Sequence, residues 1–253
     1  MFCGIKTTKH AYKYYTLITE MISYGIILYT HVGEKILFLL VKRRDSYDYV
    51  DILSGKFTTH TLQTKINNIT NSERERLLKY NFDKLWDDLW VNKNTTYIFK
   101  YEYAKKKYNN YRQKIMTICS NSKKSRSSTQ PMMWGFPKGM RKKNESEIKC
   151  ATREFFEETC LENIKDKIEI YKDRTYSEIM LGTDQKYYTS NYYLAYIDHR
   201  YIGKVEHKID TQTSIRKTTY SDEVSKIRWV SPDEEKYWSQ SKVSIIKDIL
   251  SSI

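Results

Sequence analysis

The sequence is poor in cysteine and histidine, with four residues of the first type and five of the second among 253 positions. No two cysteines form a C-x-x-C pair, and no histidine lies at zinc-site spacing from one of them. The serines and threonines belong to no recognisable nucleophile motif, which argues against Ser-His-Asp chemistry. This pattern favours a reduced, intracellular protein over a disulfide scaffold or a zinc module.

Long apolar runs are also missing. The longest, Ile26–Tyr29 and Ile36–Val41, are far shorter than the roughly 20 residues that a membrane-spanning helix needs. We also expect no signal peptide at the N-terminus. The sequence therefore predicts a soluble protein without a membrane span, and it gives no prediction of an oligomeric state.

Positive charge and tyrosine are abundant instead. Lys and Arg outnumber Asp and Glu by 44 to 31, the net charge is +13, and there are 23 tyrosines. This balance favours a polyanionic partner whose bases stack on aromatic rings, and RNA has both properties. A compositional bias toward Lys, Asn, Ile and Tyr, as in AT-rich genomes, is the alternative. The length permits one large domain, or a catalytic domain of about 150 residues plus a smaller module.

One segment has the features of an amphipathic helix that carries several carboxylates. Asn144 and Glu147 stand at capping-box spacing, which predicts a helix from about Glu145 to Thr159. Four residues recur at helical period and are expected to form its inward stripe: Ile148, Ala151, Phe155 and Thr159.

Three glutamates of this segment, Glu154, Glu157 and Glu158, project from an adjacent face of the predicted helix. Like charges at such spacing destabilise a helix by a few tenths of a kcal/mol per pair, roughly, so we expect a positive group among them. Clustered carboxylate oxygens suit Mg2+ or Mn2+. A solvated acidic helix face is the alternative.

The whole stretch from Gly139 to Leu161 resembles the Nudix signature G-x5-E-x7-R-E-U-x-E-E-x-G-U, in which U is apolar. It departs from the signature only at Cys160, where the family has glycine. The resemblance implies an α/β/α sandwich with a mixed sheet and hydrolysis of a pyrophosphate by metal-activated water, without a covalent intermediate. By the same resemblance the metal ligands are Glu154, Glu157, Glu158 and the Gly139 carbonyl, and Glu145 and Arg153 form a structural ion pair.

A base for the attacking water is expected either among the helix glutamates or in a later loop. Asp222 and Glu223 precede the strand-like run Val224–Val230, and we predict Glu223 as the base. A surface carboxylate at a strand entrance is the alternative.

The rest of the chain alternates between strand-like and helical patterns. Tyr24–Thr30 and Lys35–Lys42 flank Gly33 and predict a β-hairpin. Later strands are expected at residues 167–171, 177–181, 186–196 and 224–230. A closing helix is expected to start at Ser231 and to carry Trp238, Val243, Ile246 and Leu250.

Residues 46–116 contain one glycine and no proline. Helical spacing recurs there in Arg74–Tyr80, Phe82–Trp90 and Glu102–Ile115, and a basic, serine-rich linker is expected at residues 120–130. We therefore expect the first part of the Nudix domain at residues 1–45, an inserted helical, RNA-binding module at 46–128, and the Nudix catalytic domain with its closing helix at 129–253.

Substrate is suggested by two further resemblances. Trp134–Gly139 resembles the W-x-F-P-K-G segment of the cellular mRNA-decapping subunit, which diphosphoinositol polyphosphate hydrolases share. Lys42–Leu53, Ile69–Leu78 and Phe82–Trp90 are similar to segments of the decapping Nudix proteins of poxviruses and African swine fever virus. The resemblance implies action on capped mRNA in the cytoplasm of an infected cell, with release of 7-methyl-GDP and 5'-monophosphate RNA.

Substrate contacts are expected from basic and aromatic side chains. Lys138, Trp134 and Phe136 are predicted to bind the substrate, and Tyr187 and Tyr188 are further candidates for stacking on the cap base. RNA phosphates are expected to contact Lys105, Lys106, Lys107, Lys123, Lys124 and Arg126. Two alternatives stay open: a hydrolase of diphosphoinositol polyphosphates or dinucleotides, and a catalytically weak RNA-binding Nudix protein.

Overall fold

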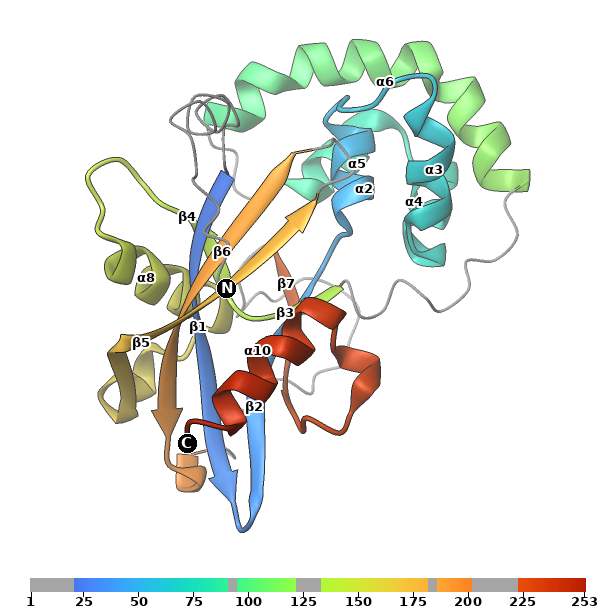
Figure 1. The fold of residues 1–253 in the computed structure, drawn as a ribbon. Coiled ribbons are helices and arrows are strands. Elements are labelled where there is room, and N and C mark those ends of the chain that lie inside the picture. Colours follow the sequence, from blue (N-terminus) through green and yellow to red (C-terminus); the bar gives the residue numbers. More distant parts are fainter. Residues whose placement is uncertain (1–20, 91–94, 122–132, 182–185, 202–222) are drawn as a thin grey trace, which may run out of the picture.

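The computed structural model describes residues 21–90, 95–121, 133–181, 186–201 and 223–253 (Figure 1). Its strands are β1 (Met21–Val32), β2 (Lys35–Arg43), β3 (Trp134–Gly135), β4 (Lys138–Met140), β5 (Ile168–Leu181), β6 (Tyr187–Ile197) and β7 (Val224–Val230). Its α-helices are α2 (Tyr47–Leu53), α3 (Thr61–Asn68), α4 (Asn71–Lys79), α5 (Phe82–Leu89), α6 (Thr95–Asn121), α8 (Glu147–Thr159) and α10 (Gln240–Leu250). Three short 3-10 helices span Glu162–Lys167, His199–Tyr201 and Glu235–Tyr237.

The strands form one seven-stranded mixed sheet. Its path is β3-β2-β1-β6-β5, with β4 paired to β1 and β7 paired to β2. Strands β1 and β6 are parallel, whereas β1 and β2 form the predicted antiparallel hairpin. Gly33 has a φ of 60° in that turn, a left-handed conformation that costs glycine little. The two strands predicted at 167–171 and 177–181 are one strand, β5, with an irregularity in its pairing between Tyr171 and Thr175.

Helices cover both faces of the sheet (Figure 1). Phe155 and Phe156 of α8 pack with Ile26 and Leu39 on one face. On the other face Ile245 and Ile249 of α10 pack in the cluster that contains Ile27, Phe38 and Tyr192. The mixed sheet between helices confirms the predicted α/β/α architecture.

The closing helix starts later than the sequence analysis predicted. Ser239 caps α10 by accepting a hydrogen bond from the Lys242 amide, so the helix begins at Gln240 and not at Ser231. Trp238 precedes the helix, and its indole donates a hydrogen bond of 3.0 Å to the Ser231 carbonyl. The buried stripe of α10 consists of Lys242, Ile245, Ile246 and Ile249, whereas Leu250 is exposed.

Helices α2 to α6 lie between β2 and β3 in the sequence, and together they enclose a second hydrophobic core. Tyr49, Trp86 and Tyr108 are fully buried in it. The three predicted helical stretches correspond to α4, α5 and α6, but the sequence analysis missed the short helices α2 and α3. Helix α6 continues to Asn121, and residues 122–130 of the predicted linker lie outside the described residues. The limits 46 and 128 of the inserted module stay a prediction.

None of the helices in the described ranges is long and apolar enough to cross a membrane.

Candidate active site

The carboxylate helix α8 begins at Glu147, after the N-cap residue Ser146. The predicted capping box is wrong, because Asn144 adopts a left-handed conformation with a φ of 63° and caps no helix. Glu147 accepts instead a hydrogen bond of 2.8 Å from the Tyr24 hydroxyl, which joins the start of α8 to β1. This hydrogen bond helps to position the N-terminus of α8 on the sheet.

Arg153 is the positive group that lies among the carboxylates of this segment. Its guanidinium forms a two-pronged ion pair with Glu145, at 2.7 and 2.9 Å. Its Nη1 also donates to Glu154 at 2.6 Å and to Glu157 at 2.9 Å. The bonds from Arg153 lower the pKa of Glu145 to about 2. Arg153 therefore offsets the repulsion between the helix glutamates and ties the preceding loop to α8.

Gly139 lies against the carboxylate of Glu154. A methyl group placed on its α-carbon would overlap both oxygens of that carboxylate. The Gly139 carbonyl accepts a long contact from the Cys150 thiol at 3.6 Å. Only a glycine lets the β4 backbone approach the helix glutamates this closely.

Glu158 is the most perturbed carboxylate of the helix. Burial and the negative charge of Glu223 raise its pKa to about 8, against the opposing effects of the Lys138 amide and the Arg43 charge. Its Oε2 accepts the main-chain hydrogen bond of Lys138 at 3.0 Å. Burial also raises the pKa of Glu154, while Arg153 opposes the shift. The raised pKa values of Glu154 and Glu158 mean that this end of α8 favours binding of a proton or a cation.

Glu223, the predicted base, is exposed at the entrance of β7. Its main-chain carbonyl accepts a hydrogen bond of 2.8 Å from the Arg44 amide. Its charge acts on Glu154, Glu158 and Arg43, so the structure brings this loop residue into the electrostatic field of the helix carboxylates.

A divalent cation needs several oxygen ligands around one point. Within the described ranges, no three His, Cys, Asp or Glu side chains are arranged as a ready metal site. Arg153 bridges Glu154 and Glu157 instead. The available donors are nonetheless hard oxygen atoms. Because Gly139 has no side chain, its backbone can lie against the Glu154 carboxylate. This chemistry fits Mg2+ or Mn2+.

An aromatic side chain that the sequence analysis missed lies at the same site. Tyr47 is 53% exposed, and the Arg43 guanidinium lies 4.1 Å from its ring centroid. Burial near the hydroxyl opposes ionisation, but the charges of Arg43 and Lys138 outweigh it and lower the pKa of Tyr47. The charge of Glu158 on α8 also acts on this hydroxyl and opposes its ionisation. Tyr47 is the kind of exposed ring on which a base can stack.

The two aromatic residues predicted to bind substrate, Trp134 and Phe136, are buried, at 6% and 2% exposure. Trp134 packs edge-on against Tyr237, and Phe136 packs against Tyr192 and Trp238. Neither ring offers a face to a base, because α10 and the segment before it cover both. The prediction that these two rings stack on the substrate is therefore wrong.

The lysines and tyrosines that were predicted to contact RNA or the cap differ in exposure and in their partners. Lys105 is held by Asp83 at 2.9 Å and by the Tyr101 hydroxyl at 2.9 Å. Lys107 lies over the Phe57 ring, whereas Lys106 is exposed. Lys123, Lys124 and Arg126 lie outside the described residues. Tyr187 is 45% exposed and Tyr188 half-buried at the start of β6.

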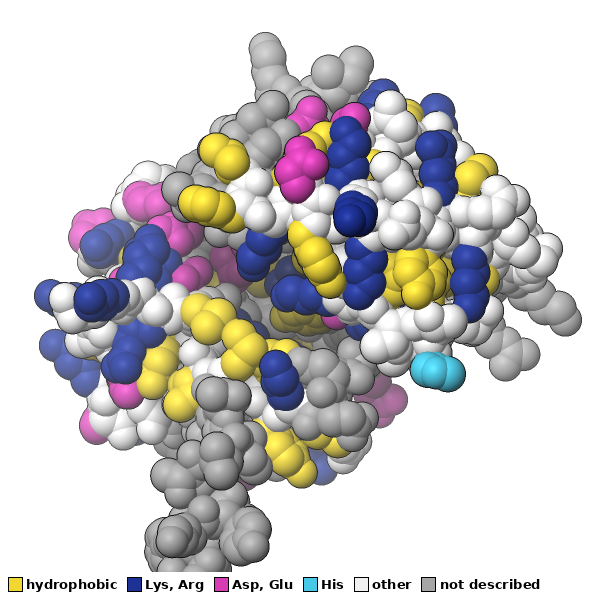
Figure 2. Space-filling model, turned by 90° about the horizontal axis from the view of Figure 1, so that it is seen from above, with side chains coloured by type: hydrophobic (Ala, Val, Ile, Leu, Met, Phe, Trp, Pro, Cys, Tyr) yellow, Lys and Arg dark blue, Asp and Glu magenta, His cyan; other side chains and the backbone are white. Residues whose placement is uncertain are grey.

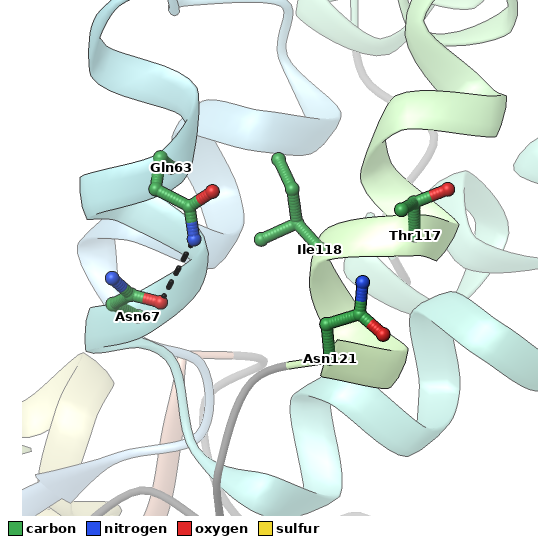
Figure 3. Close-up of a pocket in the computed structure, with 5 residues that line it drawn as sticks. All are labelled: Gln63, Asn67, Thr117, Ile118 and Asn121. Atoms are coloured by element: carbon green, nitrogen blue, oxygen red, sulfur yellow. Dashed lines mark hydrogen bonds between the residues drawn. The ribbon is translucent and has the colours of Figure 1, made fainter.

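Figure 2 shows Lys and Arg side chains in and around a hollow of the face seen from above. A separate cavity of about 360 Å³ lies between α3 and α6, where Gln63 donates to Asn67 at 3.2 Å (Figure 3). No predicted site residue lines that cavity.

The mixed sheet lies between helices, and α8, with Glu154, Glu157 and Glu158, packs against β4, which carries Gly139. This arrangement is typical of the Nudix class of pyrophosphohydrolases. The profile of the NUDIX domain matches residues 111–249, more than half of the sequence, and the chain belongs to the Nudix family.

The chain is also similar to the mRNA-decapping protein g5R of African swine fever virus. With the isolate Pig/Kenya/KEN-50/1950 it shares 24% identity over 220 residues, which cover 84% of this chain and 85% of that protein. With the isolate Warthog/Namibia/Wart80/1980 it shares 28% identity over 134 residues, or 48% of this chain and 51% of that protein. Among solved structures, the Ap4A hydrolase of C. elegans matches with a TM-score of 0.44 and 14% identity over 92% of this chain and 98% of that one.

Proposed function

We propose that this chain is a viral mRNA-decapping enzyme of the infected-cell cytoplasm. It would hydrolyse the 5' cap pyrophosphate of capped RNA and release 7-methyl-GDP and 5'-monophosphate RNA. The observation that carries the proposal is the exposed ring of Tyr47, which lies against the Arg43 guanidinium and within the electrostatic reach of Glu158, because a ring there can stack on a base near the carboxylates. The similarity to g5R proteins supports the same function.

Glu154, Glu157, Glu158 and the Gly139 carbonyl would hold Mg2+ or Mn2+. When bound, the cation lowers the pKa of a water molecule and offsets charge on the leaving phosphate. Arg153 already neutralises part of the cluster and would release Glu154 and Glu157 as ligands while keeping its two bonds to Glu145. The helix carboxylates would then bind the cation while the Arg153–Glu145 ion pair holds the preceding loop in place.

Glu223 is proposed as the base that takes a proton from the attacking water. It is exposed at the strand entrance, and its main chain is fixed to Arg44. Burial is the main cause of the raised pKa of Glu158, and the negative charge of Glu223 adds to it, so the two carboxylates act on each other. A carboxylate in this position can accept a proton if water lies within hydrogen-bond reach.

Tyr47 is proposed to stack on the cap guanine. Arg43 covers one face of the ring and orients it, and the 53% exposure of the residue leaves area for a flat base. An electron-rich ring favours the methylated, cationic base of the cap. Lys138, whose ammonium lies 3.4 Å from the Ser23 hydroxyl, would contact a phosphate of the cap triphosphate.

The RNA body is proposed to contact the inserted module at residues 46–128. Helix α6 carries one acidic residue, Glu102, against six basic ones: Lys100, Lys105, Lys106, Lys107, Arg112 and Lys114. A helix of this charge attracts phosphates without regard to base sequence. Lys106 is exposed and is the best placed of the predicted group, whereas Lys105 must first leave Asp83.

Substrate length tests this proposal. Purified protein with Mg2+ or Mn2+ is offered capped RNA, the free cap dinucleotide, diadenosine tetraphosphate and a diphosphoinositol polyphosphate at equal concentrations. We expect a kcat/KM for capped RNA at least about tenfold above that for the dinucleotide, because phosphate contacts with the RNA body add binding. Equal rates with and without the RNA body, or preference for an inositol pyrophosphate, would contradict the assignment. Binding of capped RNA without cleavage in either metal would favour a catalytically weak RNA-binding protein.

A further inference from the structure

One buried carboxylate, Asp45, lies at the point where the chain leaves β2 of the Nudix sheet and enters the inserted helices. It is 5% exposed and belongs to the short junction between β2 and α2. Its Oδ2 accepts from Arg44 Nε at 2.8 Å, and its Oδ1 accepts from the guanidinium of Arg76 on α4. Asp45 thus pairs with two guanidinium groups, one from the junction itself and one from the insertion.

Helix α4 holds this junction with two residues one turn apart. Arg76 bonds Asp45 and also Asp88 on α5, at 3.0 Å, while its guanidinium lies 4.4 Å from the Tyr49 ring centroid. Glu73, 1% exposed, accepts from both the amide and the hydroxyl of Ser46, at 2.6 and 3.0 Å. The path of residues 45 and 46 is therefore set by α4.

The same junction is bonded to the candidate active site. The Arg44 amide donates to the Glu223 carbonyl at 2.8 Å, and its guanidinium donates to the Leu89 carbonyl of α5 at 3.1 Å. Arg43 Nε donates to the Asp45 carbonyl at 3.3 Å and lies over the Tyr47 ring. Asp45 is thus linked to Glu223 through Arg44, by two hydrogen bonds, and its main chain is linked to Tyr47 through Arg43, by one hydrogen bond and one cation–π contact.

We propose that Asp45 is a positioning residue that couples the inserted helices to the active site by fixing the Arg43–Tyr47 junction. The roles assigned to Glu223 and Tyr47 rest on the proposed function. Charges are costly to bury, and apolar packing commonly stabilises as well or better, so a buried ion pair at this place is more readily explained by geometry than by stability. The insertion then serves as more than an RNA contact surface, since it sets the position of the predicted base.

The first test compares Asp45→Asn with a matched control, Asp51→Asn. Asp51 pairs with buried Lys65 at 2.8 Å inside the insertion and is 26% exposed. Among the described residues its side chain forms no ion pair with residues 43–46. On capped RNA we expect Asp45→Asn to lower kcat about tenfold or more, because small misplacements of reacting groups cost up to about 100-fold. Asp51→Asn should keep kcat within about twofold at equal folded fraction. Equal kcat for Asp45→Asn and wild type would overturn the inference.

The second test separates positioning from loss of stability. Asp45→Asn is combined with Glu223→Gln and with Tyr47→Ala, and single-turnover rates are measured at saturating substrate. If Asp45 acts through Glu223, its effect on the rate should largely vanish in the Glu223→Gln background. Losses that multiply in both backgrounds would refute the coupling. Should Asp45→Asn fail to fold, Arg76→Gln, which breaks the same bond from the α4 side, replaces it.

The choice of substrate distinguishes this inference from the proposed function. If the wild type leaves capped RNA intact but cleaves diadenosine tetraphosphate, decapping is refuted while the same variants are compared on that probe. Coupling survives if Asp45→Asn lowers that kcat and Asp51→Asn does not. It fails if both variants match the wild type.

Discussion

The main-chain amide of Lys138 donates a hydrogen bond of 3.0 Å to Oε2 of Glu158. This bond joins the short strand β4 to the last turn of α8, where burial and Glu223 raise the pKa of Glu158 to about 8. The strand that carries Gly139 and the helix that carries the carboxylates are thus held together on both sides, by Lys138 and by Arg153.

Replacement of Glu158 by glutamine tests the assignment of the helix carboxylates. Glu158→Gln should lower kcat by at least about 100-fold, because even the loss of groups that support metal ligands costs about 10- to 100-fold. The fold should survive, since the amide can still accept from Lys138. Steady-state rates and circular dichroism measure both; an active Glu158→Gln protein would show that this residue is no ligand.

Metal affinity should depend on pH through Glu158. With a pKa of about 8, the metal-free site holds a proton that a cation must displace. Apparent Mn2+ affinity should therefore rise from about pH 6 to about pH 8 and level off above it, as calorimetry can measure. Affinity that is constant over this range would contradict the raised pKa.

The same shift predicts how stability changes without metal. The unfolded chain releases this proton near the usual value of 4.5, whereas the folded protein keeps it up to about 8. The folded state therefore binds more protons in between, and this group's contribution to the free energy of unfolding falls as pH rises through that interval. Glu158→Gln, which cannot titrate, should lessen the fall in thermal denaturation series. An unchanged pH profile in the variant would contradict this.

Gly139 should tolerate no side chain. Gly139→Ala places a methyl group on the Glu154 carboxylate, so we expect at least about a 100-fold loss of activity from displaced ligands. Gly33→Ala is the matched control for adding a methyl group, since nothing lies within 4 Å of that position. The control costs stability through its φ of 60° but should keep kcat. Full activity of Gly139→Ala would refute the close approach.

The stacking role of Tyr47 can be separated from that of its hydroxyl. Tyr47→Ala should weaken binding of capped RNA by about 1–3 kcal/mol, the usual contribution of one base stacked on an aromatic ring. Tyr47→Phe should retain most of the affinity. Fluorescence anisotropy with capped and uncapped RNA of one sequence measures the difference. Equal losses for the two RNAs would place Tyr47 outside the cap site.

Cys160 occupies a position for which glycine is the better residue. Its φ of 52° and ψ of 37° are left-handed, which costs a non-glycine residue roughly 1–2 kcal/mol. Cys160→Gly also gains freedom in the unfolded chain, so we expect a net stabilisation of at most about 1 kcal/mol. Denaturant titration measures it. A destabilisation above about 1 kcal/mol would mean that the Cys160 side chain contributes packing.

The sequence was sufficient for the features that depend on local spacing. The hairpin around Gly33 and the helical character of α4 to α6 follow from periodicity, and the glutamate helix follows from its motif. The Asn144 capping box failed because Asn144 adopts a left-handed conformation and the N-cap position falls on Ser146, two residues further on, whose side chain makes no capping hydrogen bond. Helix α2 has only seven residues, and α3 carries two apolar residues, Leu62 and Ile66, where α5 of the same length carries four, so neither α2 nor α3 shows a clear period.

Features that depend on tertiary packing were beyond the sequence. Trp134 and Phe136 were predicted to meet substrate, but whether an aromatic residue is covered depends on where α10 and its preceding turn pack. Tyr47 became a candidate only when the structure showed its ring exposed, against Arg43 and within the electrostatic reach of Glu158. A tyrosine three residues after an arginine pair was the available signal, and it is too common to be specific.

The most direct test of the account is to identify the products formed from RNA labelled in its cap phosphates. The protein is incubated with this RNA and Mg2+ or Mn2+, beside Glu157→Gln and Glu158→Gln. The account predicts 7-methyl-GDP and 5'-monophosphate RNA from the wild type, and neither product from the variants. Intact RNA with the wild type in both metals, or equal product from the variants, would contradict it.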